Sequence, residues 1–148
     1  INTLLKSKQS DAVLMLDVLE HTPKFKELFE IALNIADKYA IVSLPNELFI
    51  ADRLRLLAGK EHPAHSLDLL TLPEGFKHQY LINIGKARRI LCNSAREKGY
   101  ELSEEWLRPL LTKNKIYQPG LWIARRLLSE ELWSMGSIFI FKKTSKTK

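Results

Sequence analysis

The fold is decided by residues 11–46, DAVLMLDVLEHTPKFKELFEIALNIADKYAIVSLPN. Residues 12–16 form a continuous apolar run without alternating polar positions, which is typical of a strand buried on both faces. Residues 39–44 form a second run of this kind, and Pro45-Asn46 closes it. The two runs predict neighbouring strands of one buried sheet.

The segment between the two runs predicts a helix. Thr22 is suited to the N-cap position and Pro23 to the first helical position. Apolar residues then recur at three- and four-residue spacing, which continues an amphipathic helix to about Lys38. Residues 11–46 are therefore expected to form a right-handed strand–helix–strand unit of a parallel sheet.

Composition and charge agree with an ordinary globular domain. The chain has 148 residues, of which 45% are hydrophobic and 27% are charged, and no apolar run is long enough to span a bilayer. Cys92 is the single cysteine, which excludes an internal disulfide and a thiolate metal cluster and favours a cytoplasmic location. We expect it to be a buried, inert thiol.

The formal net charge of +6 raises the question of an acidic partner. Much of the excess lies in a basic C-terminal tail, in Lys142, Lys143, Lys146 and Lys148. No aromatic residues interleave with the internal basic residues, as a surface for single-stranded nucleic acid requires. Nucleic acid is therefore a weaker candidate partner than a small molecule.

The pattern continues with alternating helical and irregular segments. Residues 47–58 predict a short helix that ends at Gly59. Residues 60–83 contain three of the four histidines and have little periodicity, as binding loops often do. Amphipathic spacing from Ile84 predicts another helix, which ends at Gly99.

The C-terminal third is expected to end in two strands without a long helix after them. Residues 100–102 predict the start of a strand, and residues 137–141 are strongly prone to form a second one. Between them, residues 104–132 suggest helical pieces broken by Pro109 and by Pro119-Gly120. The three tryptophans are expected in the core or at an interface: Trp106, Trp122 and Trp133.

We therefore divide the chain as one domain. The expected parts are a polar lead-in (1–10), a β-α-β core (11–46), an insertion (47–83), a helix with the terminal strands (84–142) and a basic tail (143–148).

Three segments together resemble the class I S-adenosylmethionine-dependent methyltransferases, a Rossmann-like family. Residues 11–21 (DAVLMLDVLEH) resemble the family's fourth-strand segment, and residues 40–46 (AIVSLPN) resemble its fifth. His78 and the helix that leads to Gly99-Tyr100 resemble the stretch before the sixth strand. The resemblance spans residues 11–103. It implies an α/β fold comprising strands four to seven of a seven-stranded sheet, with helices on both faces. It also implies that the domain is partial and that residues 47–83 are an insertion on the acceptor side.

This sequence lacks one feature of the family. There, a glycine-rich loop after the first strand lets backbone amides approach the cofactor. Gly75 and Gly85, the two nearest glycines of this sequence, are ten residues apart. There is also no room before residue 12 for three further strands. The sequence thus implies half of a cofactor site, and a fragment that is inactive alone.

The resemblance places the site beyond the carboxyl ends of the strands, where open α/β sheets bind ligands. It implies that Asp17 and Asn46 contact S-adenosylmethionine. Glu20 and Arg53 are expected to bind the acceptor, and either His21 or His78 to act as the general base. For several of these residues a structural role is the alternative: Glu20 and His21 would only favour the start of the next helix, Asn46 would form an Asx turn, and Arg53 would lie exposed on a helix.

A metal site is a further alternative. Two carboxylates and two imidazoles, from Asp17, Glu20, His21 and His78, resemble the ExxEH…H arrangement of small-RNA 2′-O-methyltransferases, where Mg²⁺ or Mn²⁺ would bind acceptor hydroxyls. His62 and His65 have the spacing of a ligand pair, but we interpret them as part of a solvated loop.

The favoured function is methyl transfer from S-adenosylmethionine to a hydroxyl, or less favourably an amine, of a small-molecule or glycan-type acceptor. A metal-dependent RNA 2′-O-methyltransferase is the alternative within the enzyme class. A non-catalytic remnant that acts as an interaction module is the alternative outside it.

Overall fold

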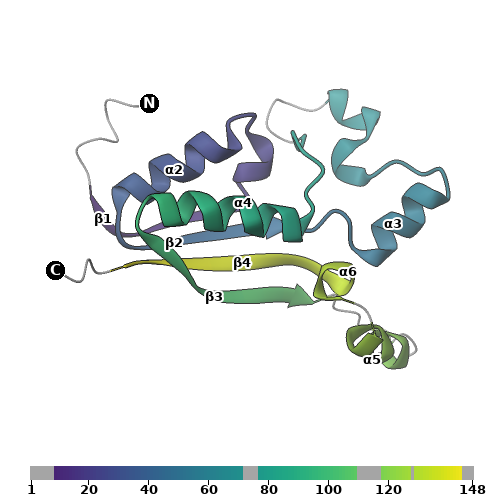
Figure 1. Ribbon diagram of the computed structural model, residues 1–148. Coiled ribbons are helices and arrows are strands. Elements are labelled where there is room, and N and C mark those ends of the chain that lie inside the picture. Colours follow the sequence, from purple (N-terminus) through teal and green to yellow (C-terminus); the bar gives the residue numbers. More distant parts are fainter. Residues whose placement is uncertain (1–8, 72–76, 110–117, 128, 145–148) are drawn as a thin grey trace.

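The expected β-α-β unit is present in the computed structural model, which describes residues 9–71, 77–109, 118–127 and 129–144 (Figure 1). Strand β1 (Ser10–Leu16) and strand β2 (Ala36–Pro45) are parallel neighbours, and helix α2 (Phe25–Ile35) connects them. Leu16 pairs with Ser43 in the register of the two strands. The carboxyl ends of β1 and β2 therefore lie side by side, and the residues that follow them share one edge of the sheet.

Two antiparallel strands complete a four-stranded sheet of order β1-β2-β4-β3. Strand β4 (Ser134–Lys143) lies between β2 and strand β3 (Tyr100–Pro109) and is antiparallel to both. The expected pair of C-terminal strands is thus confirmed. The polar lead-in lies mostly outside the described residues, as do Lys146 and Lys148 of the tail.

Both C-terminal strands are longer than predicted. Residues 104–109 are strand and not the start of helical pieces, and β4 begins at Ser134 instead of Ser137. The reason is the tertiary structure. Although the charged residues of this segment would suit a helix, β3 pairs with β4 from Tyr100 to Pro109, and this pairing provides the hydrogen bonds of its backbone. Helix α5 (Gln118–Leu127) and helix α6 (Glu130–Trp133) follow in the connection to β4.

Two helices have other bounds than the sequence predicts. Helix α2 ends at Ile35 and not near Lys38, because Ala36 already pairs with Ser10 in the sheet. Helix α3 (Ile50–Leu57) begins three residues later than predicted. Two short 3-10 helices, η2 (Pro63–His65) and η3 (Leu67–Thr71), lie in the segment that was expected to be irregular.

Helix α4 (Ile84–Glu97) has the predicted start and stop. The side chain of Asn83 accepts a hydrogen bond from the amide of Lys86 and caps the first turn. Gly99 has a φ of 77°, a left-handed conformation that ends the helix and that glycine adopts without strain. The apolar side of α4 can therefore pack on the sheet directly before β3 begins.

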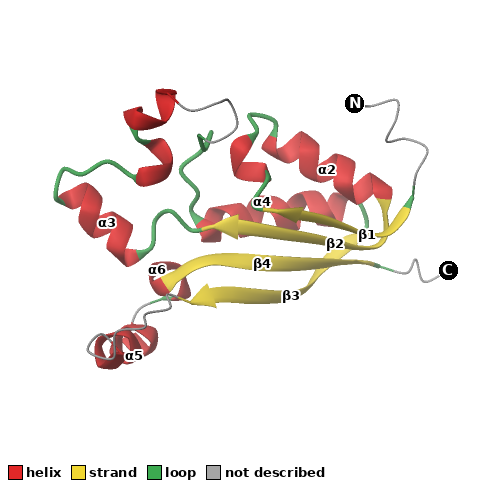
Figure 2. Cartoon of the chain, turned by 180° about the vertical axis from the view of Figure 1, so that it is seen from behind, coloured by secondary structure: helices red, strands yellow, loops and turns green. Residues whose placement is uncertain are grey.

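The core lies between the sheet and one layer of helices. Helices α2 and α4 both cover the same face, as Figures 1 and 2 show. They enclose fully buried side chains, which include Phe29, Leu33, Leu91, Tyr100, Phe139 and Phe141. Cys92 packs against this core and is partly buried, and burial raises the pKa of its thiol.

The expectation of helices on both faces is wrong for the described part of the chain. On β1, Met15 is buried under the helices, whereas Leu14 and Leu16 on the opposite face are 59% and 53% exposed. Trp106 of β3 is also exposed, and so is Trp122 of α5, so neither packs in the core. Among the described residues, no helix has the length and apolar character needed to cross a membrane.

Candidate functional site

A hollow of about 400 Å³ lies at the carboxyl ends of β1 and β2. We call it the strand-end hollow. It is lined by Asp17, Glu20, His21, Pro45, His78, Arg108, Pro109 and Met135. Four of the predicted site residues are therefore brought together: Asp17, Glu20, His21 and His78.

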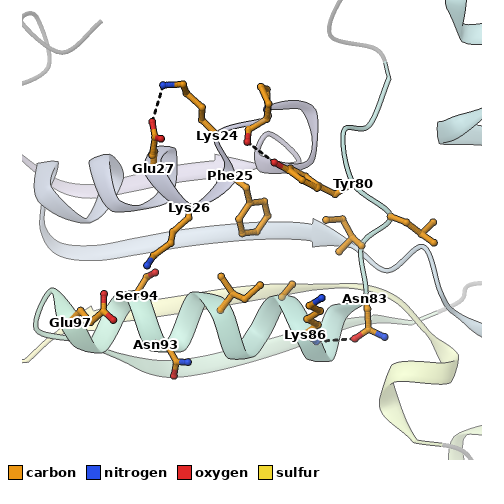
Figure 3. Close-up of a pocket in the computed structure, with 15 residues that line it drawn as sticks. Lys24, Phe25, Lys26, Glu27, Tyr80, Asn83, Lys86, Asn93, Ser94 and Glu97 are labelled. Carbon is orange, nitrogen blue, oxygen red and sulfur yellow. Dashed lines mark hydrogen bonds and ion pairs between the residues drawn. The ribbon is translucent and has the colours of Figure 1, made fainter.

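A larger hollow, of about 700 Å³, lies between α2 and α4 (Figure 3). Its polar lining includes Lys24, Lys26, Asn83 and Lys86, and Phe25 and Tyr80 contribute its aromatic surface. None of the predicted site residues lines it. The acidic and histidine residues predicted for the site therefore line the strand-end hollow and not this larger one.

Asp17 directly follows β1 and has a φ of 50°, which turns the chain sharply at the strand end. Its carboxylate accepts a hydrogen bond of 2.7 Å from the hydroxyl of Ser43, and its backbone amide donates to the carbonyl of Ser43. Both terminal nitrogens of Arg108 donate to the two carboxylate oxygens, at 3.0 and 3.1 Å. Burial alone would raise the pKa of Asp17, but these bonds and the Arg108 charge lower it below its ordinary value.

Glu20 lies in the short 3-10 helix η1 (Leu19–His21) and is only 1% exposed. Burial raises the pKa of its carboxyl, and the nearby charge of Asp17 adds to the effect. Its Oε2 atom is buried and has no hydrogen-bond partner among the described residues. A buried carboxylate oxygen without a donor is costly, unless a ligand supplies one.

His21 and His78 meet inside the hollow. Their rings are 4.5 Å apart in an edge-to-face arrangement. The Nδ1 atom of His21 is buried and unpartnered in the described part of the chain, whereas Nδ1 of His78 is 2.6 Å from Oε1 of Glu47. Glu47 thus fixes the orientation of the His78 ring, which leaves the other ring nitrogen as the candidate for proton transfer.

The four residues predicted to bind metal are only partly grouped as a ligand set. Ligand atoms of Glu20, His21 and His78 lie within 4.8 Å of one another. Asp17 is not in this group, and its carboxylate contacts Arg108 and Ser43 instead. The unpartnered atoms of Glu20 and His21 make the group of three compatible with a cation.

Asn46 and Arg53 are held by the protein itself. The Asn46 amide nitrogen donates to the carbonyls of Glu131 and Ser134, at 2.6 and 2.9 Å, and the residue is 2% exposed. Arg53 donates from Nε to the carbonyl of Leu48. Asn46 therefore braces the end of β2 against the start of β4. Contact of either residue with a ligand stays a prediction.

Glu47 is the centre of a second cluster that the sequence analysis missed. Its side chain is 3% exposed, and its Oε2 atom accepts a hydrogen bond of 2.7 Å from the amide of Ile82. His65 Nε2 is 3.2 Å from the same oxygen, and His62 Nδ1 is 3.8 Å from Oε1. Burial alone would raise the pKa of Glu47, but its hydrogen bonds from Ile82, His65 and His78 lower it.

The interpretation of His62 and His65 as part of a solvated loop is wrong. Their side chains are only 10% and 23% exposed, because the loop folds over Glu47. All four histidines of the sequence form a chain of neighbouring rings, in the order His62, His65, His78, His21. The spacing of His62 and His65 in the sequence already indicated that the two histidines could act as a pair. Nothing in the sequence indicated that Glu47 is buried beside them, because it was predicted as the first residue of a helix.

Comparisons with known proteins identify the fold. No protein-family model matches the sequence, and no curated protein is significantly similar to it. Among solved structures, the chain is similar to magnesium protoporphyrin IX methyltransferase from Synechocystis PCC 6803, with a TM-score of 0.52 and 13% identity over 93% of this chain and 47% of that one. It is also similar to a SAM-dependent methyltransferase from Archaeoglobus fulgidus, with a TM-score of 0.51 and 12% identity over 95% of this chain and 62% of that one.

These similarities confirm the α/β fold implied by the sequence, a partial Rossmann-like methyltransferase sheet with flanking helices. The chain spans between about half and just under two thirds of the length of these two structures.

Proposed function

We propose that this chain is part of an S-adenosylmethionine-dependent methyltransferase that acts on a hydroxyl, or less favourably an amine, of a small-molecule or glycan-type acceptor. The observation that carries the proposal is the strand-end hollow. It gathers Asp17, Glu20, His21 and His78 at the carboxyl ends of two parallel strands, in a fold shared with methyltransferases. Ligands of open α/β sheets bind at this edge.

Asp17 is proposed to lie on the cofactor side. It stays ionised because its pKa is lowered, and a carboxylate favours a ligand that carries a positive charge, such as a sulfonium or an ammonium group. Asn46 would act beside it, mainly by bracing the end of β2. The described residues fit one wall of such a site, and the sequence has no glycine-rich loop for another. We therefore propose that the chain is inactive alone.

Glu20, His21 and His78 are proposed to lie on the acceptor side. Methyl transfer requires an in-line approach of the acceptor atom, which is a matter of positioning. His78 is held by Glu47, and its free ring nitrogen would accept the proton of an acceptor hydroxyl; His21 is the alternative base. Arg53 would contact an anionic group of a larger acceptor.

A metal-dependent reaction is the second candidate. It is favoured by the unpartnered atoms Glu20 Oε2 and His21 Nδ1, which lie in one group with His78. Mg²⁺ or Mn²⁺ held there would lower the pKa of a bound acceptor hydroxyl. The 2′-hydroxyl of RNA is the acceptor that the chain's net charge of +6 favours in this case. A non-catalytic interaction module remains the alternative outside the enzyme class.

Calorimetric titration with S-adenosylmethionine tests the proposal. We expect no binding to the 148-residue chain and micromolar or tighter binding to a form extended at its N-terminus. In that form, Asp17→Ala should weaken binding at least tenfold, whereas Asp11→Ala, an exposed residue paired with Lys38, should not. Absence of binding in the extended form would instead support the interaction module.

A further inference from the structure

We propose that Glu47, His62 and His65 bind a Zn²⁺ ion at a site separate from the strand-end hollow. One ligand atom from each residue lies within 4.8 Å of the other two. None of the three lines the hollow. The set of two imidazoles and one carboxylate is a common zinc ligand set, and it leaves a fourth position open.

The distances are close to those of a formed site. Ligand atoms around a tetrahedral zinc ion are roughly 3.3 Å apart, as follows from a metal–nitrogen distance of about 2.0 Å. Here His65 Nε2 is 3.2 Å from Glu47 Oε2, and His62 Nδ1 is 3.8 Å from Glu47 Oε1. The two distances reach different oxygens of Glu47, and the three ligand atoms lie within 4.8 Å of one another, so zinc binding would require the carboxylate to use both oxygens or to rotate. The ion would also replace the 3.2 Å hydrogen bond that His62 Nδ1 accepts from the amide of Ala64.

The surroundings of His62 also suit a metal ligand. Its Nε2 atom is 3.3 Å from Oδ2 of Asp52, and Asp52 is itself buried. Histidines that bind metal usually donate the other ring N–H to a carboxylate, which orients the ring and strengthens the ligand. Asp52 provides this contact from α3, while His62 comes from the loop after it.

A divalent cation would balance the charge of the Glu47 carboxylate. Within the described residues, Glu47 lies within 4 Å of ring nitrogens of three histidines: His62, His65 and His78. A buried carboxylate surrounded by imidazoles is neutralised only if one of them is protonated, whereas a divalent ion neutralises it with the rings in the neutral form.

The position of the cluster indicates what the ion would do. Glu47 follows β2, and the two histidines lie around η2, so a bound ion would fasten this loop to the end of the sheet. The amide of His78 already donates to the carbonyl of Ala64, next to His65. A zinc ion would thus fix the segment that holds His78 in the strand-end hollow. This role does not depend on methyl transfer.

Zinc binding to the metal-stripped chain, measured by competition with a chromogenic chelator, tests the proposal. We expect one ion per chain. His62→Ala and His65→Ala should each weaken binding at least a hundredfold, and Asp52→Asn should weaken it by 10- to 100-fold. The matched control is His21→Ala, which alters the other histidine cluster and should leave the affinity within twofold.

Cobalt provides a second readout that does not require removal of a ligand. Co²⁺ bound to the unaltered chain should give the visible absorption of a tetrahedral site, and one equivalent of Zn²⁺ should abolish it. Failure of the unaltered chain to bind zinc would overturn the proposal. So would binding that His21→Ala abolishes and His62→Ala leaves intact, because the ion would then lie in the strand-end hollow.

Discussion

Arg108 and Asp17 form a two-pronged ion pair at the edge of the strand-end hollow. We predict that Arg108→Met raises the pKa of Asp17. Burial opposes ionisation of this carboxyl, and the variant lacks the hydrogen bonds and the positive charge of Arg108 that offset this effect. NMR titration of the Asp17 carboxyl would measure the change, with Lys38→Met, which removes the exposed partner of Asp11, as the control. The effect on stability should be below about 1 kcal/mol, since both side chains are partly exposed.

The same ion pair determines how the stability of the fold depends on pH in the acidic range. The pKa of Asp17 is lower in the folded chain than in the unfolded one, so its contribution to stability is present above the unfolded value, about 3.9. That contribution is lost as the pH falls through the folded-state pKa. Arg108→Met should move this loss to higher pH, and an unchanged acid transition would contradict the prediction.

The pKa of Glu20 is shifted in the opposite direction to that of Asp17, and its effect on stability therefore has the opposite dependence on pH. Its pKa is raised by burial, so the folded state holds its proton more tightly, and the stability this provides is lost as the pH rises through the folded-state pKa. We predict that Glu20→Gln increases the free energy of unfolding by about 1 kcal/mol at pH 7 and not at pH 4, because it removes a buried charge. Urea denaturation at the two pH values measures the difference. Glu27→Gln, at an exposed pair with Lys24, should show no comparable gain.

At the scale of the elements, the close approach of β4 to β2 depends on Gly136. A Cβ atom at this position would lie 2.4 Å from the carbonyl oxygen of Leu44 and 2.6 Å from Nη2 of Arg108. We predict that Gly136→Ala destabilises the fold by about 1–3 kcal/mol, measured by chemical denaturation. Gly120→Ala in α5 is the matched control, because no described residue places an atom within 4 Å of its Cβ position. Equal stabilities of the two variants would disprove the predicted clash.

The elements also show which features could be predicted from the sequence. Strands β1 and β2 were predictable because each contains an unbroken apolar run, although one face of β1 is exposed in the described part of the chain. Only the start of strand β3, residues 100–102, was predictable, because β3 lies at the edge of the sheet and the charged residues that follow resemble a helical pattern. For the same reason Arg108 was missed as a site residue. It lies 91 positions after Asp17 in the sequence, and a local sequence pattern cannot predict a contact between residues so far apart.

At the scale of the whole molecule, one face of the sheet lacks a covering layer in the described part of the chain. Leu14, Leu16 and Trp106 lie exposed there, and the register of the strands places all three on the same side. These three side chains are apolar, although the same register also places Glu104 and Arg108 on this face. Among the described strands, β1 is in addition an edge strand. Exposed apolar sheet faces and open edges promote association between chains.

We therefore predict that the 148-residue chain self-associates and that the double substitution Leu14→Lys, Leu16→Lys makes it monomeric in sedimentation velocity. Leu57→Lys is the control, because Leu57 is 84% exposed on α3, away from this face, and should not change the association. A monomeric unaltered chain would contradict the prediction. In a longer form, further residues of a methyltransferase domain would cover this face, and that form should be monomeric without any substitution. In that form, the double substitution should instead weaken binding of S-adenosylmethionine, because it would displace β1 and, with it, Asp17.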